Sequence, residues 1–251
     1  FADLGNSVTC IEYDQKKYES LQKGIIPFFE PELNEKFTKT VEKNRLTIKK
    51  SMDPAMFDSD FIFLAVGTPM SNSGEADLTY LFSAVESICD TANLYDFESS
   101  IVLTTKSTVP VGTGKKITQM IKDKRLSEFI SVASNPEFLR EGSAVHDFFH
   151  PDRIVIGCDD PDTFKVFEQL YNPICRNSRP LVNVSLETAE LTKYAANTFL
   201  ATKISFMNEM ARICDHVGAD ISDVSRLMGL DGRIGKYFLN PSPGYGGSCF
   251  P

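Results

Sequence analysis

Long hydrophobic runs are missing from this sequence. None approaches the roughly 20 apolar residues that a membrane-spanning helix needs, so we expect no membrane partner and no signal peptide. Positive charge is also scarce, because 26 Lys and Arg residues stand against 34 Asp and Glu, a net charge of −8. A general nucleic-acid binder needs a basic face. We therefore expect no nucleic-acid partner.

Metal-binding patterns are missing as well. The six cysteines include no CxxC pair, and the three histidines have no ligand spacing, so we expect no metal site. Cysteines this scattered do not form the dense framework of a disulfide-rich secreted domain. We therefore expect a reducing, cytoplasmic environment. The hydrophobic fraction of 42% is ordinary for a globular protein with a core.

Short apolar runs alternate with helical patterns through residues 1–186. We predict strands at Val8–Asp14, Phe61–Val66, Ile101–Lys106, Phe129–Ser134, Arg153–Gly157 and Pro180–Val184. Helical stretches lie between most of them, for instance Leu78–Cys89 and Thr163–Tyr171. This alternation predicts an α/β fold with a mostly parallel sheet and helices on both faces. The continuous run at Phe61–Val66 predicts a strand that is buried on both sides.

The pattern changes after about Leu186. Residues 187–218 contain no proline and place apolar residues at helical spacing, and Gly218 is a stop signal. A helix of this length measures about 45 Å at 1.5 Å per residue, so we expect it to bridge domains or subunits. A shorter helix is predicted at Ile221–Met228. We place a domain boundary here, with one domain at 1–186 and the second at 187–251.

The beginning of the chain indicates a dinucleotide-binding fold. FADLGN is typical of the last turn of a helix, capped by Gly5, and the strand that follows ends near an acid, Glu12. After the second strand of such folds, an acid binds the ribose hydroxyls. The first strand and its Gly-rich phosphate turn would lie about 20 residues upstream and are not in the sequence. We therefore expect a piece of a longer protein that lacks segments at both ends.

Polar turns follow two neighbouring strands, at the sheet edge where such folds bind ligands. VGTP (Val66–Pro69) follows the first, and KSTVPVGT, with hydroxyls at Ser107 and Thr108, follows the next. Either hydroxyl alone is more often a helix cap, but two such turns favour a site. VGTGKK (Val111–Lys116) fails the P-loop pattern and predicts only the start of a surface helix.

Two glutamates follow the third strand of this edge. Glu137 and Glu141 are four residues apart and would share a face if the stretch were helical. Glu137 is closer to the strand end and is the candidate general base, whereas Glu141 could equally be a carboxylate at a helix start. Lys193 and Asn197 on the long helix are also four apart. Their spacing weakly favours residues that line a binding site over residues on a solvated surface.

A cysteine in a glycine-rich loop stands near the end of the sequence. Arg233 precedes this loop, which is rich in Gly and Pro and whose backbone N–H groups suit an anion. Cys249 follows three glycines in GYGGSCFP, and glycine lets a backbone approach a ligand closely. A cation such as Lys193 would lower the pKa of a cysteine. We interpret Cys249 as a nucleophile; a structural cysteine is the alternative.

Together these stretches resemble the nucleotide-sugar 6-dehydrogenases. The resemblance covers essentially the whole chain and includes VGTP, KSTVPVGT and IPFFEPEL (Ile26–Leu33), followed by NPEFLREGSAVHDFFHPDRIVIG, ELTKYAANTFLATKISFMNE and DGRIGKYFLNPSPGYGGSCFP. It implies a Rossmann-like NAD-binding domain, a long central helix used for dimerisation, and a further C-terminal domain, absent here, that completes the UDP site. The present chain alone is expected to be inactive.

The resemblance implies a four-electron oxidation of a primary alcohol to a carboxylate by two NAD⁺. UDP-glucose is the expected substrate; GDP-mannose, another nucleotide sugar and a non-catalytic nucleotide-sugar-binding protein are the alternatives. Cys249 would form a thiohemiacetal and then a thioester, which water activated by Glu137 would hydrolyse. Lys193 would stabilise the oxyanion, Asn197 would hold the same oxygen or a water, and Thr108 would position water.

The resemblance also implies binding residues. The residues expected to bind NAD are Glu12, Lys17, Val66, Gly67, Thr68, Ser107, Thr108 and Glu141. Glu12 is also indicated by its place after the strand. Those expected for the UDP-sugar are Phe138, Leu139, Glu141, Lys193, Asn197, Arg233, Tyr237, Asn240, Ser242 and Gly246. Arg233 would reach the sugar of a partner subunit. The expected assembly is a homodimer through the 187–218 helix.

Overall fold

A computed structural model describes residues 1–71, 73–95, 97, 100–175 and 180–243 of the chain. The chain divides into two compact units, Phe1–Leu191 and a second unit that begins at Thr192. The boundary lies within the long helix α7 (Leu186–Val217). Each unit is described by itself.

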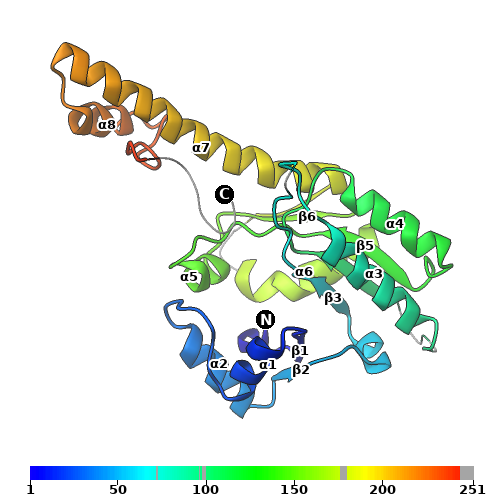
Figure 1. Cartoon of the computed structure of the whole chain (residues 1–251). Helices are drawn as coiled ribbons and strands as arrows, with labels where there is room; N and C mark the ends of the chain where they lie inside the picture. The colour runs from blue at the N-terminus through cyan, green and yellow to red at the C-terminus, as the bar shows by residue number, and fades with distance from the viewer. Residues whose placement is uncertain (72, 96, 98–99, 176–179, 244–251) are drawn as a thin grey trace. The chain divides into compact units, whose positions relative to one another are not determined.

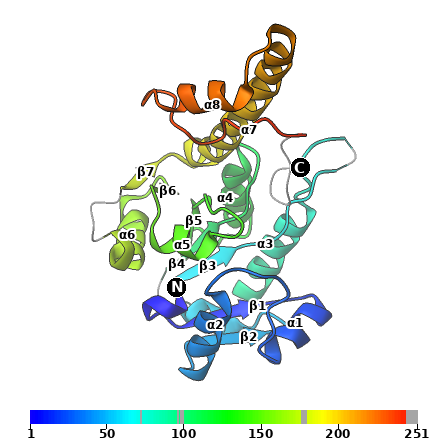
Figure 2. The same cartoon turned by 90° about the vertical axis from the view of Figure 1, so that its left-hand side faces the viewer.

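Over its described residues, the first unit contains two sheets (Figures 1 and 2). The smaller one pairs β1 (Val8–Ile11) in parallel with β2 (Leu46–Lys49). The larger one has the order β3 (Phe61–Leu64), β4 (Ile101–Thr105), β5 (Ile130–Ser134), β6 (Ile154–Gly157) and β7 (Leu181–Val184). Its strands β3, β4 and β5 are parallel, β6 runs antiparallel to β5, and β7 is parallel to β6. The predicted α/β fold with a mostly parallel sheet is confirmed.

Helices cover both faces of the larger sheet. The helical elements of this unit are the 3₁₀ turns η1 (Ala2–Leu4) and η2 (Pro54–Asp58) and the helices α1 (Gln15–Gln22), α2 (Leu33–Glu42), α3 (Thr79–Ala92), α4 (Thr113–Asp123), α5 (Ala144–Phe149) and α6 (Pro161–Cys175). Helices α3 and α4 lie side by side on one face, and α6 lies on the other (Figures 1 and 2). Strand β4 shows why both layers are needed, because Ile101 and Leu103 pack with α3 and α4 while Val102 packs with Phe167 of α6.

The structure corrects one strand prediction and adds elements that the pattern did not reveal. Strand β3 is only half-buried over Phe61–Phe63, because it is the edge strand of the larger sheet, whereas β4 is buried throughout. Strand β2 and helices α1 and α2 were not predicted. The sequence of β2, LTIK, is only four residues long and half polar, too short for a clear alternation. Gly5 caps η1 with φ +110°, as expected of the FADLGN turn.

The second unit consists of α7 from Thr192 onward, the helix α8 (Ile221–Gly229) and the segment that follows it. Helix α7 ends at Val217, and Gly218 follows with φ +74°, so the predicted stop is confirmed. Helix α8 lies alongside the C-terminal part of α7 (Figures 1 and 2). The side chain of Asp220 caps α8 by accepting a hydrogen bond from the amide of Ser222. Over the described residues, none of the helices combines the length and the apolar character of a membrane span.

Candidate active site

The turns after β3 and β4 hold each other in place through hydroxyl groups. The Ser107 hydroxyl donates to the carbonyl oxygen of Val66 at 2.6 Å, and the Thr68 hydroxyl donates to that of Thr108 at 2.8 Å. Neither Ser107 nor Thr108 caps the next helix, since Gly112 is the N-cap residue of α4. The structure therefore brings the two predicted turns together and excludes the helix-cap alternative for Ser107 and Thr108. It also confirms that the VGTGKK stretch starts a helix.

Asn135 is a buried polar residue directly after β5, and no pattern in the sequence singled it out. Its side chain is 1% exposed, and its amide group donates to the carbonyl oxygen of Val155 at 3.0 Å. Its side-chain oxygen accepts from the hydroxyl of Tyr171 and, at 3.2 Å, from the ammonium of Lys106. Because three hydrogen bonds hold this side chain, it fixes the backbone that leads into Glu137.

Glu137 lies on a loop and not on a helix. Residues 135–140 have no regular structure and α5 begins only at Ala144, so the condition of a helical stretch is not met and Glu137 and Glu141 do not share a helical face. Pro136 cannot donate a backbone hydrogen bond, and the Glu137 carboxylate itself accepts from the amide of Leu139 at 2.6 Å. Glu137 is half-buried, while Leu139 and Glu141 are exposed.

Two arginine side chains make contacts that restrain this loop. The guanidinium of Arg153 lies 3.9 Å from the centre of the Phe138 ring, which is a cation–π contact. Further along, the Arg140 guanidinium forms an ion pair with Asp147 at 2.6 Å and holds the pKa of that carboxyl at about 2. Both contacts fix side chains that follow the candidate base, Phe138 and Arg140, so this part of the loop is restrained.

Two buried glutamates that are not among the predicted site residues anchor the two loops. Glu30, in IPFFEPEL, is 8% exposed and accepts from the amides of Gly142 at 2.9 Å and Ala144 at 2.7 Å. Glu190, in the first turns of α7, is 2% exposed and accepts in the same way from two amides at the start of α4. Burial raises the pKa of Glu190, and its amide hydrogen bonds oppose that rise. Each carboxylate therefore ties a distant segment to a loop of the candidate site.

Glu12 lies directly after β1, as predicted. Its backbone amide continues the pairing with Lys49, and its carboxylate accepts from the amide of Asp14 at 2.9 Å. Asp14 in turn caps α1 by accepting from the amide of Lys17 at 2.9 Å. The Glu12 carboxylate is thus held at a strand end, while the Lys17 side chain is exposed on the first turn of α1.

Lys193 and Asn197 lie one helical turn apart on α7. Lys193 is 4% exposed, which excludes the solvated-surface alternative for this lysine, and Asn197 is half-buried. With Glu190 they have the spacing i, i+3 and i+7, which places all three on one face of the helix. This spacing was a signal in the sequence that could have identified Glu190.

The segment after α8 carries the remaining predicted residues that the structure describes. Arg233 is exposed and pairs with Asp231 through two of its nitrogens, with Nε 3.0 Å from Oδ1 and Nη2 2.5 Å from Oδ2. Tyr237 and Asn240 are exposed, and the amide of Ser242 donates to the side-chain oxygen of Asn208 at 2.8 Å. The predicted residues Cys249 and Gly246 lie outside the described residues.

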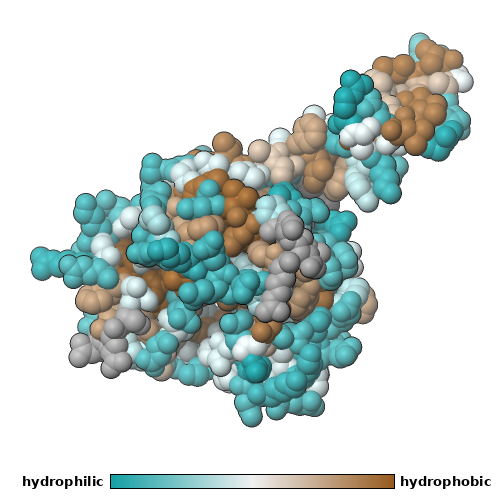
Figure 3. Space-filling view, turned by 180° about the vertical axis from the view of Figure 1, so that it is seen from behind, coloured by the Kyte–Doolittle hydropathy of each residue, from teal (hydrophilic) through white to brown (hydrophobic). Residues whose placement is uncertain are grey.

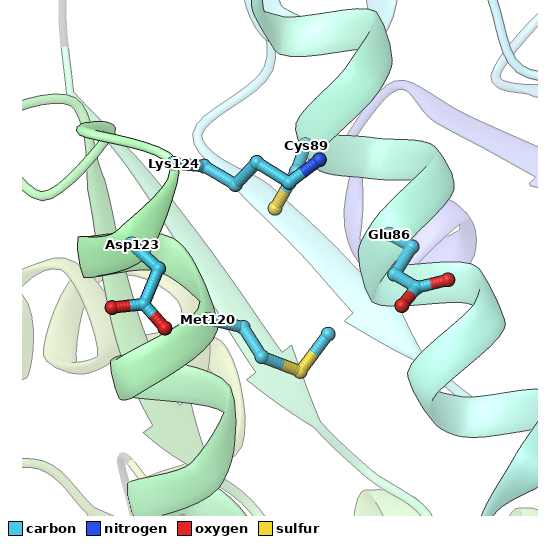
Figure 4. Close-up of a pocket in the computed structure, with 5 residues that line it drawn as sticks. All are labelled: Glu86, Cys89, Met120, Asp123 and Lys124. Atoms are coloured by element: carbon cyan, nitrogen blue, oxygen red, sulfur yellow. The ribbon is translucent and has the colours of Figure 1, made fainter.

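A shallow pocket lies elsewhere, between α3 and α4 (Figure 4). It has a cavity volume of about 180 Å³, and its lining consists of Glu86, Cys89, Met120, Asp123 and Lys124. The ammonium of Lys124 is paired with Asp90 at 2.9 Å, and burial raises the pKa of the Cys89 thiol. None of these five residues is a predicted site residue. Within the described parts of the chain, no cluster of His, Cys, Asp and Glu has the arrangement of a metal site.

Comparison with protein families assigns the chain. The NAD binding domain of the UDP-glucose/GDP-mannose dehydrogenase family matches residues 1–175, and the central domain of the same family matches residues 187–251. The chain belongs to this family. The family resemblance drawn from the sequence motifs is thereby confirmed, as is the dinucleotide-binding fold of the first unit.

Similar proteins extend the match along the whole chain. A UDP-glucose 6-dehydrogenase of Rhizobium meliloti (strain 1021) is 48% identical over 254 residues, covering 100% of this chain and 57% of its own length. UDP-glucose 6-dehydrogenase TuaD of Bacillus subtilis (strain 168) is 47% identical, covering 100% of this chain and 53% of its own length. The chain thus spans about half the length of these relatives.

Solved structures of the family share the fold. A UDP-glucose dehydrogenase from the archaeon Pyrobaculum islandicum superposes with a TM-score of 0.92 at 37% identity, covering 99% of this chain and 57% of the other. A GDP-mannose dehydrogenase from Pseudomonas aeruginosa gives a TM-score of 0.86 at 29% identity, covering 100% of this chain and 58% of the other. The family fold therefore extends over both units.

Proposed function

We propose that the full-length protein oxidises the C6 hydroxymethyl group of UDP-glucose to a carboxylate with two equivalents of NAD⁺. The observation that carries this proposal is the 48% identity, over the whole chain, to a relative named UDP-glucose 6-dehydrogenase. The geometry supports it, because Glu137 sits on a loop that is fixed from both sides by Asn135 and Glu30. A positioned carboxylate is what a general base requires.

The residues present in the first unit fit a nicotinamide dinucleotide. Glu12 offers a carboxylate, held by the amide of Asp14, at the strand end where ribose hydroxyls bind in dinucleotide folds. The joined turns at Val66–Thr68 and Ser107–Thr108 present backbone and hydroxyl groups at the carboxyl ends of β3 and β4. Bound NAD⁺ supplies a hydride acceptor for each of the two oxidations. All other chemistry comes from the residues of the chain.

Covalent capture of an aldehyde by Cys249 is the proposed centre of the mechanism. The first oxidation removes a hydride from C6 and a proton from its hydroxyl, leaving an aldehyde. The Cys249 thiolate adds to the aldehyde carbon, and the resulting thiohemiacetal loses a second hydride and a proton to become a thioester. Glu137 takes a proton from water, which attacks the thioester carbon and releases the thiolate and the carboxylate product.

Lys193 and Asn197 are proposed to serve the oxygen atom at C6. An ammonium group stabilises the negative charge that develops there during thiolate addition and during hydrolysis. Lys193 suits this role because it is buried, where a charge acts more strongly than in water. Asn197, one turn further along, would donate to the same oxygen or to an ordered water, and Thr108 would hold the hydrolytic water near Glu137.

The exposed face of α7 supports the proposed homodimer. In the second unit, Met207 and Cys214 are buried, while Phe199, Phe206 and Ile213, seven residues apart, are exposed. Figure 3 shows hydrophobic surface on this unit. A helix that is apolar on two faces is typical of one that is buried on both sides. We propose that a second copy of the protein covers this face, and that the exposed Arg233 side chain reaches the sugar bound to the partner.

A panel of nucleotide sugars tests the proposal. Full-length protein is assayed with NAD⁺ and UDP-glucose, GDP-mannose or UDP-N-acetylmannosamine, and NADH formation is measured. We expect kcat/KM to be highest with UDP-glucose. A higher kcat/KM with GDP-mannose would show that GDP-mannose is the substrate. GDP-mannose is the second candidate because the fold is similar to that of a GDP-mannose dehydrogenase, with a TM-score of 0.86. Tight binding of a nucleotide sugar without NADH formation would identify a non-catalytic binding protein.

A further inference from the structure

Two buried carboxylates bind backbone amides in the same geometric pattern. Glu190 accepts from Gly112 at 2.6 Å and from Gly114 at 2.7 Å. Glu30 accepts from Gly142 at 2.9 Å and from Ala144 at 2.7 Å. In each case one oxygen binds the amide of a glycine and the other oxygen binds the amide two residues later.

The glycines explain why the pattern is possible. Gly112 has φ +92° and Gly142 has φ +81°, a left-handed conformation that other residues seldom adopt. In both loops the chain then enters a helix, α4 or α5. Gly114 and Ala144 lie in the first turns of these helices, where amides lack internal partners, while Gly112 is the N-cap residue of α4 and Gly142 precedes the N-cap residue of α5. A carboxylate with two acceptor oxygens satisfies both amides at once, and its negative charge is favourable at this end of a helix.

Each carboxylate connects segments that are far apart in the chain. Glu190 joins the start of α7 to the loop after β4, which carries Ser107 and Thr108. Glu30 joins the connection between α1 and α2 to the loop after β5, which carries Glu137. These two loops hold the residues to which the proposed mechanism assigns the base and the water. The carboxylates lie outside the proposed chemistry, yet they determine where both loops end.

We infer that Glu30 and Glu190 are positioning residues that hold the two catalytic loops in register with the sheet edge. The expected effect on catalysis rests on the proposed function. The positioning of the two loops by these carboxylates does not depend on that function. Neither residue touches the reacting atoms in the proposed mechanism. Their effect passes through the backbone of residues 106–114 and 136–144.

Conservative substitutions of the two glutamates test the inference in the full-length protein. In Glu190→Gln and Glu30→Gln the side chain keeps its shape, but one acceptor oxygen becomes an NH₂ group that faces a backbone N–H. We expect the corresponding loop amides to exchange hydrogen about tenfold faster, since one buried hydrogen bond is lost. We expect kcat to fall about 10- to 100-fold, because small misplacements of catalytic groups have costs of this order. The KM for UDP-glucose should change less than kcat.

Matched controls separate positioning from general destabilisation. Glu209→Gln lies on the same helix as Glu190 and loses a surface ion pair with Arg212, and Glu35→Gln lies on the exposed side of α2. All variants are assayed at a temperature at which circular dichroism shows them fully folded. Both controls should retain wild-type kcat and loop exchange. If one Gln variant does not fold, the other carries the test on its own loop.

The outcomes are distinct. Slower turnover with faster exchange confined to the bonded loop supports the inference, and partial recovery in Glu190→Asp, which restores two acceptor oxygens, supports it further. Wild-type exchange in both Gln variants overturns it, as does a loss of kcat that is equal in variants and controls. If the wild-type protein oxidises no nucleotide sugar, the proposed function fails. The hydrogen-exchange measurement would still decide whether the carboxylates hold the loops.

Discussion

The backbone of Gly157 on β6 lies against Ala189 on α7, with no room for a side chain between them. A Cβ atom placed on residue 157 would lie 2.7 Å from the Cβ of Ala189 and 3.0 Å from the backbone of Leu186 and of Ser185. Real atoms do not approach so closely, and two of the three neighbours are backbone atoms that cannot rotate away. This contact determines how closely the start of α7 packs on the sheet, and hence where Glu190 lies.

Gly157→Ala is therefore expected to destabilise the protein. The added methyl group forces β6 and α7 apart, and overpacking of this kind lowers the free energy of unfolding by about 1–3 kcal/mol. Gly232→Ala is the control, because nothing lies within 4 Å of a Cβ at that position. Its effect should stay within about 0.5 kcal/mol. Urea unfolding measures both values, and equal stability of the two variants would contradict the packing described here.

Removing the Tyr171 hydroxyl should weaken the anchor at Asn135. The hydroxyl donates to the Asn135 side-chain oxygen in a buried setting, so Tyr171→Phe is expected to lower the free energy of unfolding by about 1 kcal/mol. Tyr80 is exposed on α3, and Tyr80→Phe should have no measurable effect. A Tyr171→Phe variant as stable as Tyr80→Phe would show that this hydrogen bond does not hold the loop.

The ion pair between Arg140 and Asp147 predicts a dependence on pH. The Arg140 guanidinium lowers the pKa of Asp147 from 3.8 to about 2. A lowered folded-state pKa means that the carboxylate stabilises the fold above its unfolded-state pKa, and that this contribution is lost as the pH falls from about 4 to about 2. Carboxyl NMR titration should find the low pKa in the wild-type protein and a value nearer 3.8 in Arg140→Gln. Arg212→Gln, which removes a distant surface pair with Glu209, should leave it unchanged. A normal Asp147 pKa in the wild-type protein would contradict the contact.

Much of the first unit could be predicted from sequence because its strands are apolar and flanked by turns. The strands β4, β5 and β6 bury most of their residues, so their runs are distinct, and the end of α7 is marked by Gly218. The conformation of the loop after β5 was left open by the sequence, because the spacing of Glu137 and Glu141 is compatible with a helix, while Pro136 and the Glu137–Leu139 hydrogen bond favour a turn. A loop held by a proline and a side-chain hydrogen bond has no periodic pattern in its sequence.

The sequence gives no signal for Glu30, and for Glu190 only its helical spacing with Lys193 and Asn197. Glu30 and Glu190 are buried acids whose hydrogen-bond partners are distant in the sequence. Glu30 is 112 residues from Gly142, and Glu190 is 78 residues from Gly112. Burial of a charged side chain runs against its usual preference, so composition gives no hint of it. Only the fold brings these carboxylates to the amides that make their burial favourable.

Glu12 predicts a preference between cofactors in the full-length protein. A carboxylate after β1 accepts from a ribose 2′-hydroxyl and repels a 2′-phosphate, so Kd should be lower for NAD⁺ than for NADP⁺. In Glu12→Gln the discrimination should fall by about tenfold, which corresponds to the loss of about 1.4 kcal/mol of differential binding. Glu19→Gln, on the exposed side of α1, is the control. Tighter binding of NADP⁺ by the wild-type protein would contradict the assignment.

The number of NADH molecules formed for each uronate released tests the central proposal most directly. Full-length wild-type protein, supplied with UDP-glucose and excess NAD⁺, is predicted to form two NADH per UDP-glucuronate, with no free aldehyde. Cys249→Ser should lose at least about 100-fold in turnover, or about 2.7 kcal/mol of barrier, because serine is a far weaker nucleophile toward the aldehyde. Two NADH per uronate in the wild-type protein, together with a Cys249→Ser variant that stalls, is the result that we predict. One NADH per product, or near-normal turnover of Cys249→Ser, would contradict the four-electron cysteine mechanism.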